Sequence, residues 1–369
     1  MGELRDIVRP EIGLVAPYNS GMTLEAIIER YAPARIAKLG SNENPLGPTP
    51  LVTSTLGLGA DFLRLYPDPH GDQLRRALAA RLGVDPDTII LGNGSEDLIA
   101  IIARAVIRSG DRVATLYPSF SLHEDYAIAL GATIQRVGLR DDLSIDVDAL
   151  VEAARGGPRI LVFSNPMNPA GCWLSGADLS RVVDALPKDC LLVVDEAYFE
   201  YAEGDDYADA IALLRSDDRP WIILRTFSKA WGLAGLRVGY GVVGSAALRG
   251  MFDLVRTPFN VNSVAQAAAL IALSDPDHLR EVVSLARSER ARMFDWLSAR
   301  GLRVVPSKGN FLFFDCGGNA SDFVEELLPQ GVIVKPWKQP GYDQFIRVSI
   351  GSPAENAHFM AAMSSCHPK

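Results

Sequence analysis

Short, uninterrupted apolar runs recur in the middle of the chain, at residues 160–163, 191–194 and 222–224. Each run is rich in branched side chains, which is typical of strands that are buried on both faces of a parallel sheet. An amphipathic pattern over residues 179–186 lies between the first two runs and predicts a helix. This alternation predicts an α/β fold, with a mostly parallel, doubly wound sheet that is flanked by helices.

Polar residues follow each apolar run directly. They are Ser164 and Asn165, Asp195 and Glu196, and Arg225 and Thr226. Because open α/β sheets bind their ligands outside the carboxyl ends of the strands, we expect the functional groups at this edge of the sheet.

The last third of the chain has a different pattern. Residues 278–300 predict one long amphipathic helix that stops at Gly301, and Ser352 and Pro353 begin a closing helix. Short strand patterns occupy residues 302–305, 310–314, 332–334 and 345–350. With 369 residues, the chain is long enough for two domains. We predict an N-terminal arm that also forms part of a small α+β domain (1–40), a large domain (41–262) and the remainder of the small domain (263–369).

Charge and cysteine content exclude several classes of protein. The 36 Lys and Arg residues against 45 Asp and Glu residues give a net charge of −9, which argues against a nucleic-acid partner. The four cysteines form no CxxC pair, so they predict no zinc site and fit a reducing compartment. The sequence begins without a signal-peptide pattern, and its longest uncharged stretch, residues 257–274, contains polar side chains. We therefore expect a cytoplasmic protein without membrane association.

One loop could bind a phosphate group. Residues 92–95, Gly-Asn-Gly-Ser, precede an apolar helix pattern, and such a helix start offers free backbone N–H groups to an anion. Arg237 could add a permanent positive charge. The alternative is a plain turn with a helix cap, and we expect Glu96 and Asp97 to complement the helix dipole.

Two residues near strand ends could carry chemistry. Lys229 could lose its charge by desolvation and act as a nucleophile or base, although a solvated loop lysine is the alternative. Asp195 needs a cation or a protonated nitrogen beside it, with a structural salt bridge or a helix cap as the alternative. Residues 239–244 match the dinucleotide fingerprint GxGxxG, but 240–243 predict a strand where that fingerprint requires a helix. A dehydrogenase is therefore not favoured.

The order of these motifs resembles that of the fold-type-I pyridoxal-phosphate aminotransferases. The shared motifs are the Gly-rich helix start, Asn-Pro-Met-Asn-Pro at 165–169, Asp-Glu-Ala-Tyr at 195–198, and Thr-Phe-Ser-Lys at 226–229 with Arg237 after it. Ala170 stands where that family usually has Thr. Further motifs make the chain most similar to the histidinol-phosphate aminotransferase branch, and they lie at residues 16–18, 39–48, 66–68, 74–78 and 346–351.

This resemblance implies a role in cofactor binding for several residues. Lys229 would hold pyridoxal 5'-phosphate as a Schiff base and move the substrate proton, and Asp195 would keep the pyridine nitrogen protonated. Asn168 and Tyr198 would hydrogen-bond the O3' oxygen of the ring, and Phe120 would stack on it. The catalytic set is therefore expected to be Lys229, Asp195 and Tyr198.

The resemblance also implies which residues hold the cofactor phosphate. They are Gly94, Ser95, Ser228 and Arg237, which combine backbone N–H groups with an arginine fork. Tyr66 would reach the phosphate in the site of a second copy of the chain, which implies a homodimer.

The substrate would contact a further set of residues. Arg347 would hold the substrate anion, Tyr18 would close over it from the N-terminal arm, and Asn168 would lie beside it. Residues 334–337 stand where the branch commonly shows an Arg-Asp pair. Lys335 would also contact the substrate, but lysine cannot make the bidentate contact of arginine. Trp337 would add apolar surface near the pocket, and both changes leave room for an aromatic amino acid as the donor. His123 is open between a substrate contact and an ordinary partly buried histidine.

The implied reaction has a small-molecule amine and a keto acid as its substrates. It converts histidinol phosphate and 2-oxoglutarate to imidazole-acetol phosphate and glutamate, a step of histidine biosynthesis. The alternatives are an aromatic amino-acid aminotransferase and, more distantly, a pyridoxal-phosphate-dependent threonine-phosphate decarboxylase. A binding protein that has lost catalysis is a further alternative, which Asp195, Lys229 and Arg237 argue against.

Overall fold

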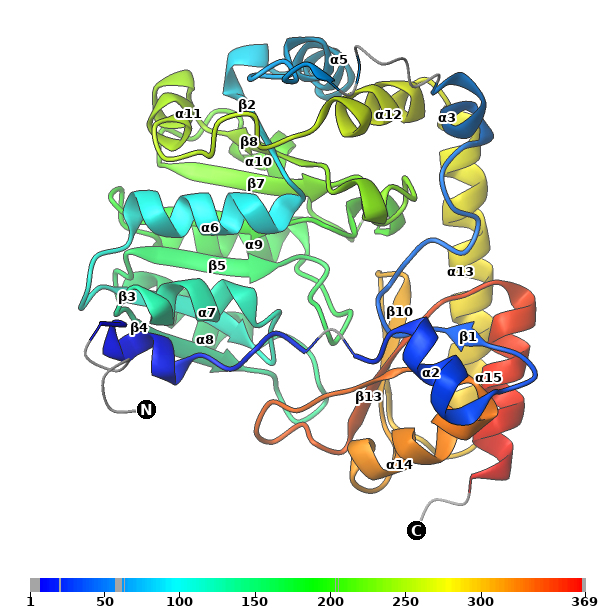
Figure 1. Ribbon diagram of the computed structural model, residues 1–369. Coiled ribbons are helices and arrows are strands. Elements are labelled where there is room, and N and C mark those ends of the chain that lie inside the picture. The colour runs from blue at the N-terminus through cyan, green and yellow to red at the C-terminus, as the bar shows by residue number, and fades with distance from the viewer. Residues whose placement is uncertain are drawn as a thin grey trace.

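The computed structural model describes residues 7–19, 21–56, 62, 64–202, 204 and 206–366. A large sheet with helices on both faces lies beside a smaller sheet, and the long helix α13 (Pro276–Ser298) runs along both (Figure 1). None of the helices in the described ranges is long and apolar enough to cross a membrane.

The large sheet has seven strands in the order β2-β8-β7-β6-β5-β3-β4. All are parallel to one another except β8, which runs antiparallel to both of its neighbours. The predicted α/β fold with a mostly parallel sheet is therefore confirmed. The strands are β2 (Ile89–Gly92), β3 (Arg112–Tyr117), β4 (Thr133–Gly138), β5 (Ile160–Ser164), β6 (Leu191–Asp195), β7 (Trp221–Thr226) and β8 (Gly239–Val243).

Alternating side chains of the central strands enter two different cores. Leu161 and Phe163 of β5 pack in the core on one face of the sheet, whereas Ile160 and Val162 pack in the core on the other. Both faces are apolar, which explains why the sequence of each strand is an uninterrupted apolar run. Residues 240–243 lie within β8, as predicted, so the GxGxxG match does not begin a helix.

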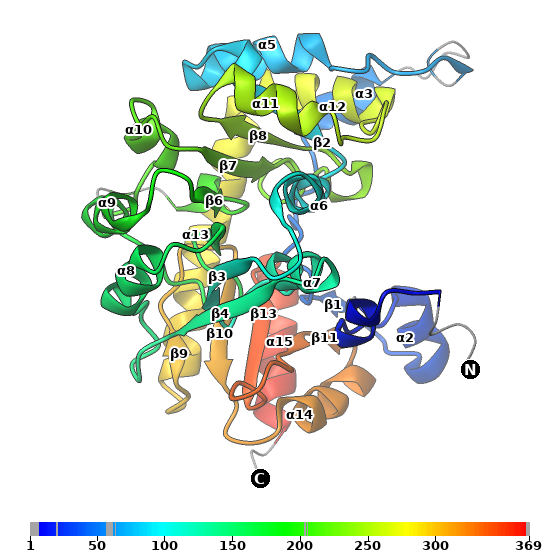
Figure 2. The ribbon, with the colours of Figure 1, turned by 90° about the vertical axis from the view of Figure 1, so that its left-hand side faces the viewer.

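Helices cover both faces of this sheet, as Figure 2 shows. One face packs against α5 (Asp72–Leu82), α8 (Val147–Arg155), α9 (Gly176–Ala185), α10 (Ala210–Leu214) and α12 (Ser263–Leu273). The other packs against α6 (Ser95–Val106), α7 (Leu122–Ala129) and α11 (Ala246–Asp253).

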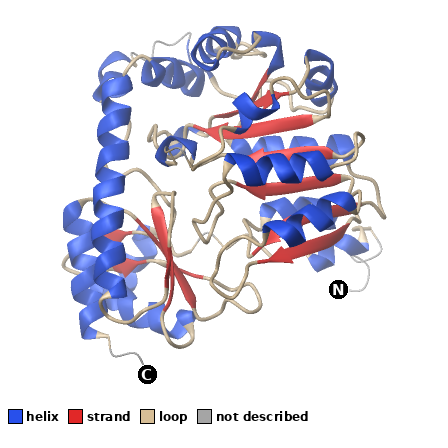
Figure 3. Ribbon diagram, turned by 180° about the vertical axis from the view of Figure 1, so that it is seen from behind, coloured by secondary structure: helices blue, strands red, loops and turns tan. Residues whose placement is uncertain are grey.

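The smaller unit contains segments from both ends of the described chain (Figure 1), and its strands lie apart from the large sheet (Figure 3). Its antiparallel sheet has the order β12-β13-β10-β9, and β1 pairs in parallel with β11 beside it. These strands are β1 (Ala37–Lys38), β9 (Val304–Val305), β10 (Phe311–Asp315), β11 (Val332–Ile333), β12 (Lys335–Pro336) and β13 (Phe345–Ser349). Helices α2 (Leu24–Tyr31), α14 (Ala320–Leu327) and α15 (Pro353–Ser365) pack in its core, and α15 begins at a capping box between Ser352 and Glu355. Helix α3 (Pro50–Thr55) packs through Val52 in the core of the large sheet.

Helix α12 belongs to the core of the large sheet, which differs from the expected boundary at residue 263. Ala265, Ala268, Ala269 and Ala272 are buried in that core. The second half of α13, with Met293 and Leu297, packs instead in the core of the smaller unit. The small alanine side chains allow α12 to pack closely, so the larger core extends further along the chain than its strand pattern indicates.

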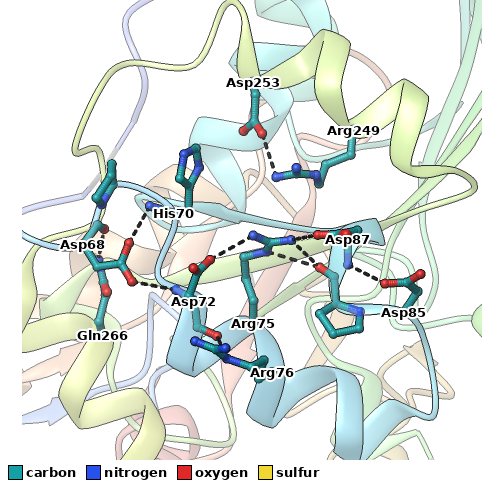
Figure 4. A network of polar contacts seen from close by, with 12 residues as sticks. Asp68, His70, Asp72, Arg75, Arg76, Asp85, Asp87, Arg249, Asp253 and Gln266 are labelled. Carbon is teal, nitrogen blue, oxygen red and sulfur yellow. Dashed lines mark hydrogen bonds and ion pairs between the residues drawn. The ribbon is translucent and has the colours of Figure 1, made fainter.

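A buried arginine fixes the start of the large sheet (Figure 4). Arg75 of α5 is only 6% exposed, and its guanidinium lies 3.1 Å from Asp72 and 2.9 Å from Asp87. It also donates to the carbonyl of Pro86, at 2.6 Å from Nη2. The contacts tie α5 to the turn that leads into β2, and the bound Asp carboxylates compensate for the burial of the charge.

Candidate active site

A cavity of about 450 Å³ lies between the carboxyl ends of the large-sheet strands and the smaller unit. Most residues predicted for the site line it, although they come from elements far apart in the sequence. The predicted residues that line it are Tyr18, Ser95, Phe120, Asn168, Asp195, Tyr198, Ser228, Lys229, Arg237, Lys335 and Arg347.

Asp195 ends β6 at the floor of this cavity and is only 4% exposed. One carboxylate oxygen, Oδ2, lies 3.1 Å from His123 Nε2, and the other accepts a hydrogen bond from the backbone N–H of Ala197. His123 belongs to α7, and its Nδ1 is buried without a partner among the described residues. In this structure the polar side-chain partner of the buried Asp195 carboxylate is thus the imidazole of His123.

Lys229 follows β7, and its Nζ donates to the carbonyl oxygen of Ser41 at 2.9 Å. Burial lowers the pKa of Lys229 to about 7, with a smaller contribution from the positive charge of Arg347. The negative charge of Glu43 acts in the opposite direction. A large fraction of this amine is therefore neutral near pH 7, which is the form that acts as a nucleophile or base.

Tyr198 and Asn168 each have one hydrogen-bonding group committed within the protein. Asn42 Nδ2 donates to the Tyr198 hydroxyl oxygen at 3.0 Å, and burial raises the pKa of Tyr198 to about 12. The Oδ1 of Asn168 accepts from Arg347 at 2.7 Å, while its amide nitrogen has no partner in the part of the chain that the structure describes. The Tyr198 hydroxyl proton and the Asn168 amide nitrogen are thus available to a ligand.

Arg347 is a buried cation held by two protein oxygens. Its Nη1 donates to Asn168, and its Nη2 donates to the carbonyl of Gly40 at 2.7 Å. The Nε is buried and has no partner among the described residues. No carboxylate of the described chain lies within ion-pair distance of Arg347, which favours an anionic ligand beside it.

The Gly-rich loop and Arg237 form a cradle at another part of the cavity. Gly94 has φ of +79°, and a Cβ at this position would lie 2.5 Å from Nη2 of Arg237. Helix α6 begins at Ser95, and Gly94, at its N-cap, provides no side chain to accept from the first N–H groups. Ser228 Oγ lies 3.5 Å from Arg237 Nη1. Backbone donors, a hydroxyl and a guanidinium thus meet at one place, which is the donor set that a phosphate requires.

The N-terminal arm crosses the mouth of the cavity at Tyr18. Its ring is in edge contact with Phe120, with centroids 6.2 Å apart, and the Lys335 amine lies 5.1 Å from its centre. Lys335 also donates to the carbonyl of Asn19. The segment therefore links the large-sheet side of the cavity to β12.

Three predicted residues lie outside the lining of the cavity. Gly94 lies behind Arg237, where it makes room for the guanidinium. Tyr66 is 82% exposed and stacks on Phe259, so within one chain it does not reach the cavity. Trp337 is 8% exposed, packs edge-on against Phe313 in the core and adds no surface to the cavity.

Several residues in or beside the cavity were not predicted from the sequence. Ser41, Asn42 and Glu43 lie in the motif at 39–48, but nothing in that motif indicates which side chains face Lys229. Glu43 lines the cavity and pairs with Lys38 at 2.7 Å. His123, whose role the sequence left open, does not line the cavity: it is 3% exposed and contacts Asp195.

Comparison with known proteins places the chain in one family. The family described as "Aminotransferase class I and II" matches residues 34–363. Histidinol-phosphate aminotransferase 1 of Mesorhizobium japonicum is 61% identical over 99% of both chains. Histidinol-phosphate aminotransferase 3 of Rhizobium meliloti is 53% identical over 96% of both.

A solved structure agrees with this assignment. The histidinol-phosphate aminotransferase from Sinorhizobium meliloti, in complex with pyridoxal 5'-phosphate, superposes with a TM-score of 0.87, 31% identity and 96% coverage of both chains. The predicted fold type and the predicted enzyme class are confirmed by these similarities. The chain therefore belongs to the class I and II aminotransferase family and has its type-I fold.

Proposed function

We propose that this aminotransferase uses pyridoxal 5'-phosphate to transfer the amino group of histidinol phosphate to 2-oxoglutarate, in histidine biosynthesis. The observation that carries the proposal is the cavity that brings Lys229, Asp195 and Arg237 together with two further cations, Lys335 and Arg347. Two relatives that match nearly the whole chain at more than half identity bear the name histidinol-phosphate aminotransferase.

The residues of the cavity fit the cofactor. The cradle of Gly94, Ser95, Ser228 and Arg237 provides donors for a phosphate, and a Cβ at Gly94 would fill the space that the guanidinium occupies. Asp195 would pair with the ring nitrogen, and Phe120 would provide an aromatic face. The free donors of Tyr198 and Asn168 would hydrogen-bond the O3' oxygen.

The chain's own residues divide the chemistry among them. When bound, pyridoxal phosphate supplies an electron sink for the charge that remains when a proton leaves the substrate Cα. Lys229 would form the covalent attachment to the cofactor and, as a neutral amine, would accept and return that proton. Asp195 would keep the ring nitrogen protonated, and its contact with His123 orients the carboxylate. Tyr18 would cover the cavity and exclude water.

Both proposed substrates are anionic, and one pair of cations can serve both. Arg347 and Lys335 line the same cavity, and the buried Nε of Arg347 has no partner in the described chain. The phosphate of the amine and a carboxylate of the keto acid would bind there in turn. Lysine contributes a point charge, whereas arginine contributes a directional fork.

We also propose that the enzyme is a homodimer in which Tyr66 reaches the cofactor phosphate of the partner. This is supported by the exposure of Tyr66 and by the apolar side chains exposed near it in the structure. Those side chains are Leu65, the preceding residue in the chain, and Phe259, on which the Tyr66 ring stacks. Sedimentation of the wild type and activity of a mixture of Tyr66→Phe and Lys229→Ala variants test this, because hybrid dimers would carry one intact site.

A donor screen tests the substrate. Purified enzyme is incubated with 2-oxoglutarate and histidinol phosphate, phenylalanine, tyrosine or threonine phosphate, and glutamate and carbon dioxide are measured. Histidinol phosphate is expected to have the highest kcat/KM for glutamate formation. Faster turnover of phenylalanine or tyrosine would contradict the assignment, and carbon dioxide release without glutamate would indicate a decarboxylase. The position of Trp337 in the core removes one argument for the aromatic alternative.

A further inference from the structure

The two acids in the first turn of α6 have different environments. Asp97 Oδ2 accepts from the backbone N–H of Asn93 at 3.0 Å and from the amide of Asn260 at 2.6 Å. Asp97 thus holds the Gly-rich loop in place. Glu96 instead lines the active-site cavity, so complementing the helix dipole does not account for its position.

Glu96 is an ionic partner of the cradle arginine. Its Oε2 lies 3.7 Å from Nη2 of Arg237, and about half of each side chain is exposed. The Nη1 of Arg237 is already committed, since it donates to the carbonyl of Ala234 at 3.2 Å and lies near Ser228. The Nη2 faces Glu96 and has no hydrogen-bond partner of its own among the described residues, so an incoming anion can use it.

Tyr126 keeps Glu96 beside the cradle. The Tyr126 hydroxyl, on α7, donates to Glu96 Oε1 at 3.2 Å. Burial, followed by the charge of Glu96, raises the pKa of Tyr126 to about 12, so this hydroxyl stays protonated at neutral pH. Glu96 is thus held through one oxygen by Tyr126, while its other oxygen faces Arg237.

We propose that Glu96 is the counter-ion of Arg237. It holds the guanidinium in place when no phosphate is bound, and it competes with the cofactor phosphate for the guanidinium when the cofactor binds. Each carries negative charge and uses the same guanidinium nitrogen. Glu96 therefore weakens cofactor affinity and favours exchange of the cofactor. The inference rests on the proposed use of pyridoxal phosphate and adds a residue that opposes its binding.

The test is titration of cofactor-free protein with pyridoxal 5'-phosphate, comparing wild type with Glu96→Gln. Glutamine keeps an acceptor for Tyr126 but carries no charge. We expect the dissociation constant to fall about fivefold at low salt, as for the loss of one unit charge a few ångströms from the ligand in a water-rich site. The difference should shrink as salt is raised, because both side chains are half exposed.

Two further ligands localise the effect. Inorganic phosphate should also bind Glu96→Gln more tightly than it binds the wild type. Its binding is measured as the rise in the melting temperature of the cofactor-free protein. Pyridoxal, which has the same ring and aldehyde but no phosphate, should bind both proteins equally. The matched control is Asp322→Asn, which removes an exposed acid from the first turn of α14, outside the cavity, and should change the cofactor affinity by less than about twofold.

The outcomes separate this inference from the proposed function. Unchanged or weaker cofactor binding by Glu96→Gln would overturn the inference, as would an equal gain for pyridoxal. If neither protein bound pyridoxal 5'-phosphate, the proposed function itself would fail and the inference with it.

Discussion

Lys335 on β12 lies directly opposite Arg347 on β13, in register across an antiparallel pair. Residues that oppose one another in this way project from the same face of a sheet, and both side chains line the active-site cavity. Burial, followed by the charge of Arg347, lowers the pKa of Lys335 to about 8. Two like charges held together at the cost of desolvation indicate a site that an anionic substrate stabilises.

Removal of the charge at Lys335 is expected to affect anionic donors selectively. Lys335→Met should lower kcat/KM for histidinol phosphate about tenfold, the loss of one charge-assisted contact, and should affect phenylalanine less. In the wild type, KM for histidinol phosphate should also rise above about pH 8, where Lys335 loses its proton. Steady-state kinetics with both donors measure this. Lys338→Met, an equal charge change outside the cavity, is the control, and equal losses for the two donors would contradict the role.

Replacement of Lys229 by alanine is expected to abolish catalysis. The variant has no amine at the end of β7, so borohydride should trap no covalent cofactor adduct, and turnover should fall by at least about 100-fold. Mass spectrometry of the reduced protein and a glutamate assay measure the two effects. Lys188→Ala, outside the cavity, should keep both. A trapped adduct in Lys229→Ala would show that another residue forms it.

Attachment of the cofactor should depend on pH with a midpoint near 7. Only the neutral amine of Lys229 is nucleophilic, so the rate of adduct formation by cofactor-free protein should rise ~tenfold per pH unit below pH 7 and level off above it. Stopped-flow absorbance measures the rate. Arg347→Met removes a positive charge that lowers this pKa, so its rate should level off at a higher pH. A wild-type rate that still rises at pH 9 would show a lysine with an ordinary pKa.

Replacement of Asp195 should lower kcat more than replacement of His123. Asp195→Asn removes the charge proposed to hold the ring nitrogen protonated and should lower kcat by roughly 100- to 1,000-fold. His123→Phe leaves the carboxylate but removes its 3.1 Å partner, so we expect roughly a tenfold loss. The absorbance spectrum of the bound cofactor as a function of pH should shift in both variants. An unchanged spectrum in His123→Phe would mean that this histidine only packs.

Gly94 should be required for the cofactor cradle more than for the fold. In Gly94→Ala, the new Cβ would lie 2.5 Å from the Arg237 guanidinium, so the affinity for pyridoxal phosphate should fall by at least about tenfold. Gly110→Ala is a matched control, since Gly110 also has a positive φ but nothing lies within 4 Å of a Cβ there. Both variants place a Cβ on a backbone with positive φ and should lose roughly 1–3 kcal/mol of stability, whereas only Gly94→Ala should lose affinity.

The central strands were predictable from sequence because their signal is local. A strand that is buried on both faces needs consecutive apolar side chains, and residues 160–163 and 191–194 form β5 and β6. The position of α12 in the core of the large sheet was not predictable in this way. Its alanine-rich pattern does not show which sheet the helix packs against, since that depends on residues distant in the chain.

The residues of the candidate site also fall into those that the sequence predicts and those that only the tertiary structure identifies. Motif order and strand ends alone predicted Asp195, Lys229 and Arg237, because parallel strands bring their carboxyl ends to one edge. Three contacts depend on the tertiary structure alone: His123 lies beside Asp195, Glu96 faces Arg237, and Trp337 packs in the core instead of lining the cavity. The lowered pKa of Lys229 also depends on the tertiary structure, because Arg347, whose charge lowers it, lies more than a hundred residues away in the chain. Local patterns determine strands and helices, whereas desolvation and charge pairing arise only when distant segments pack together.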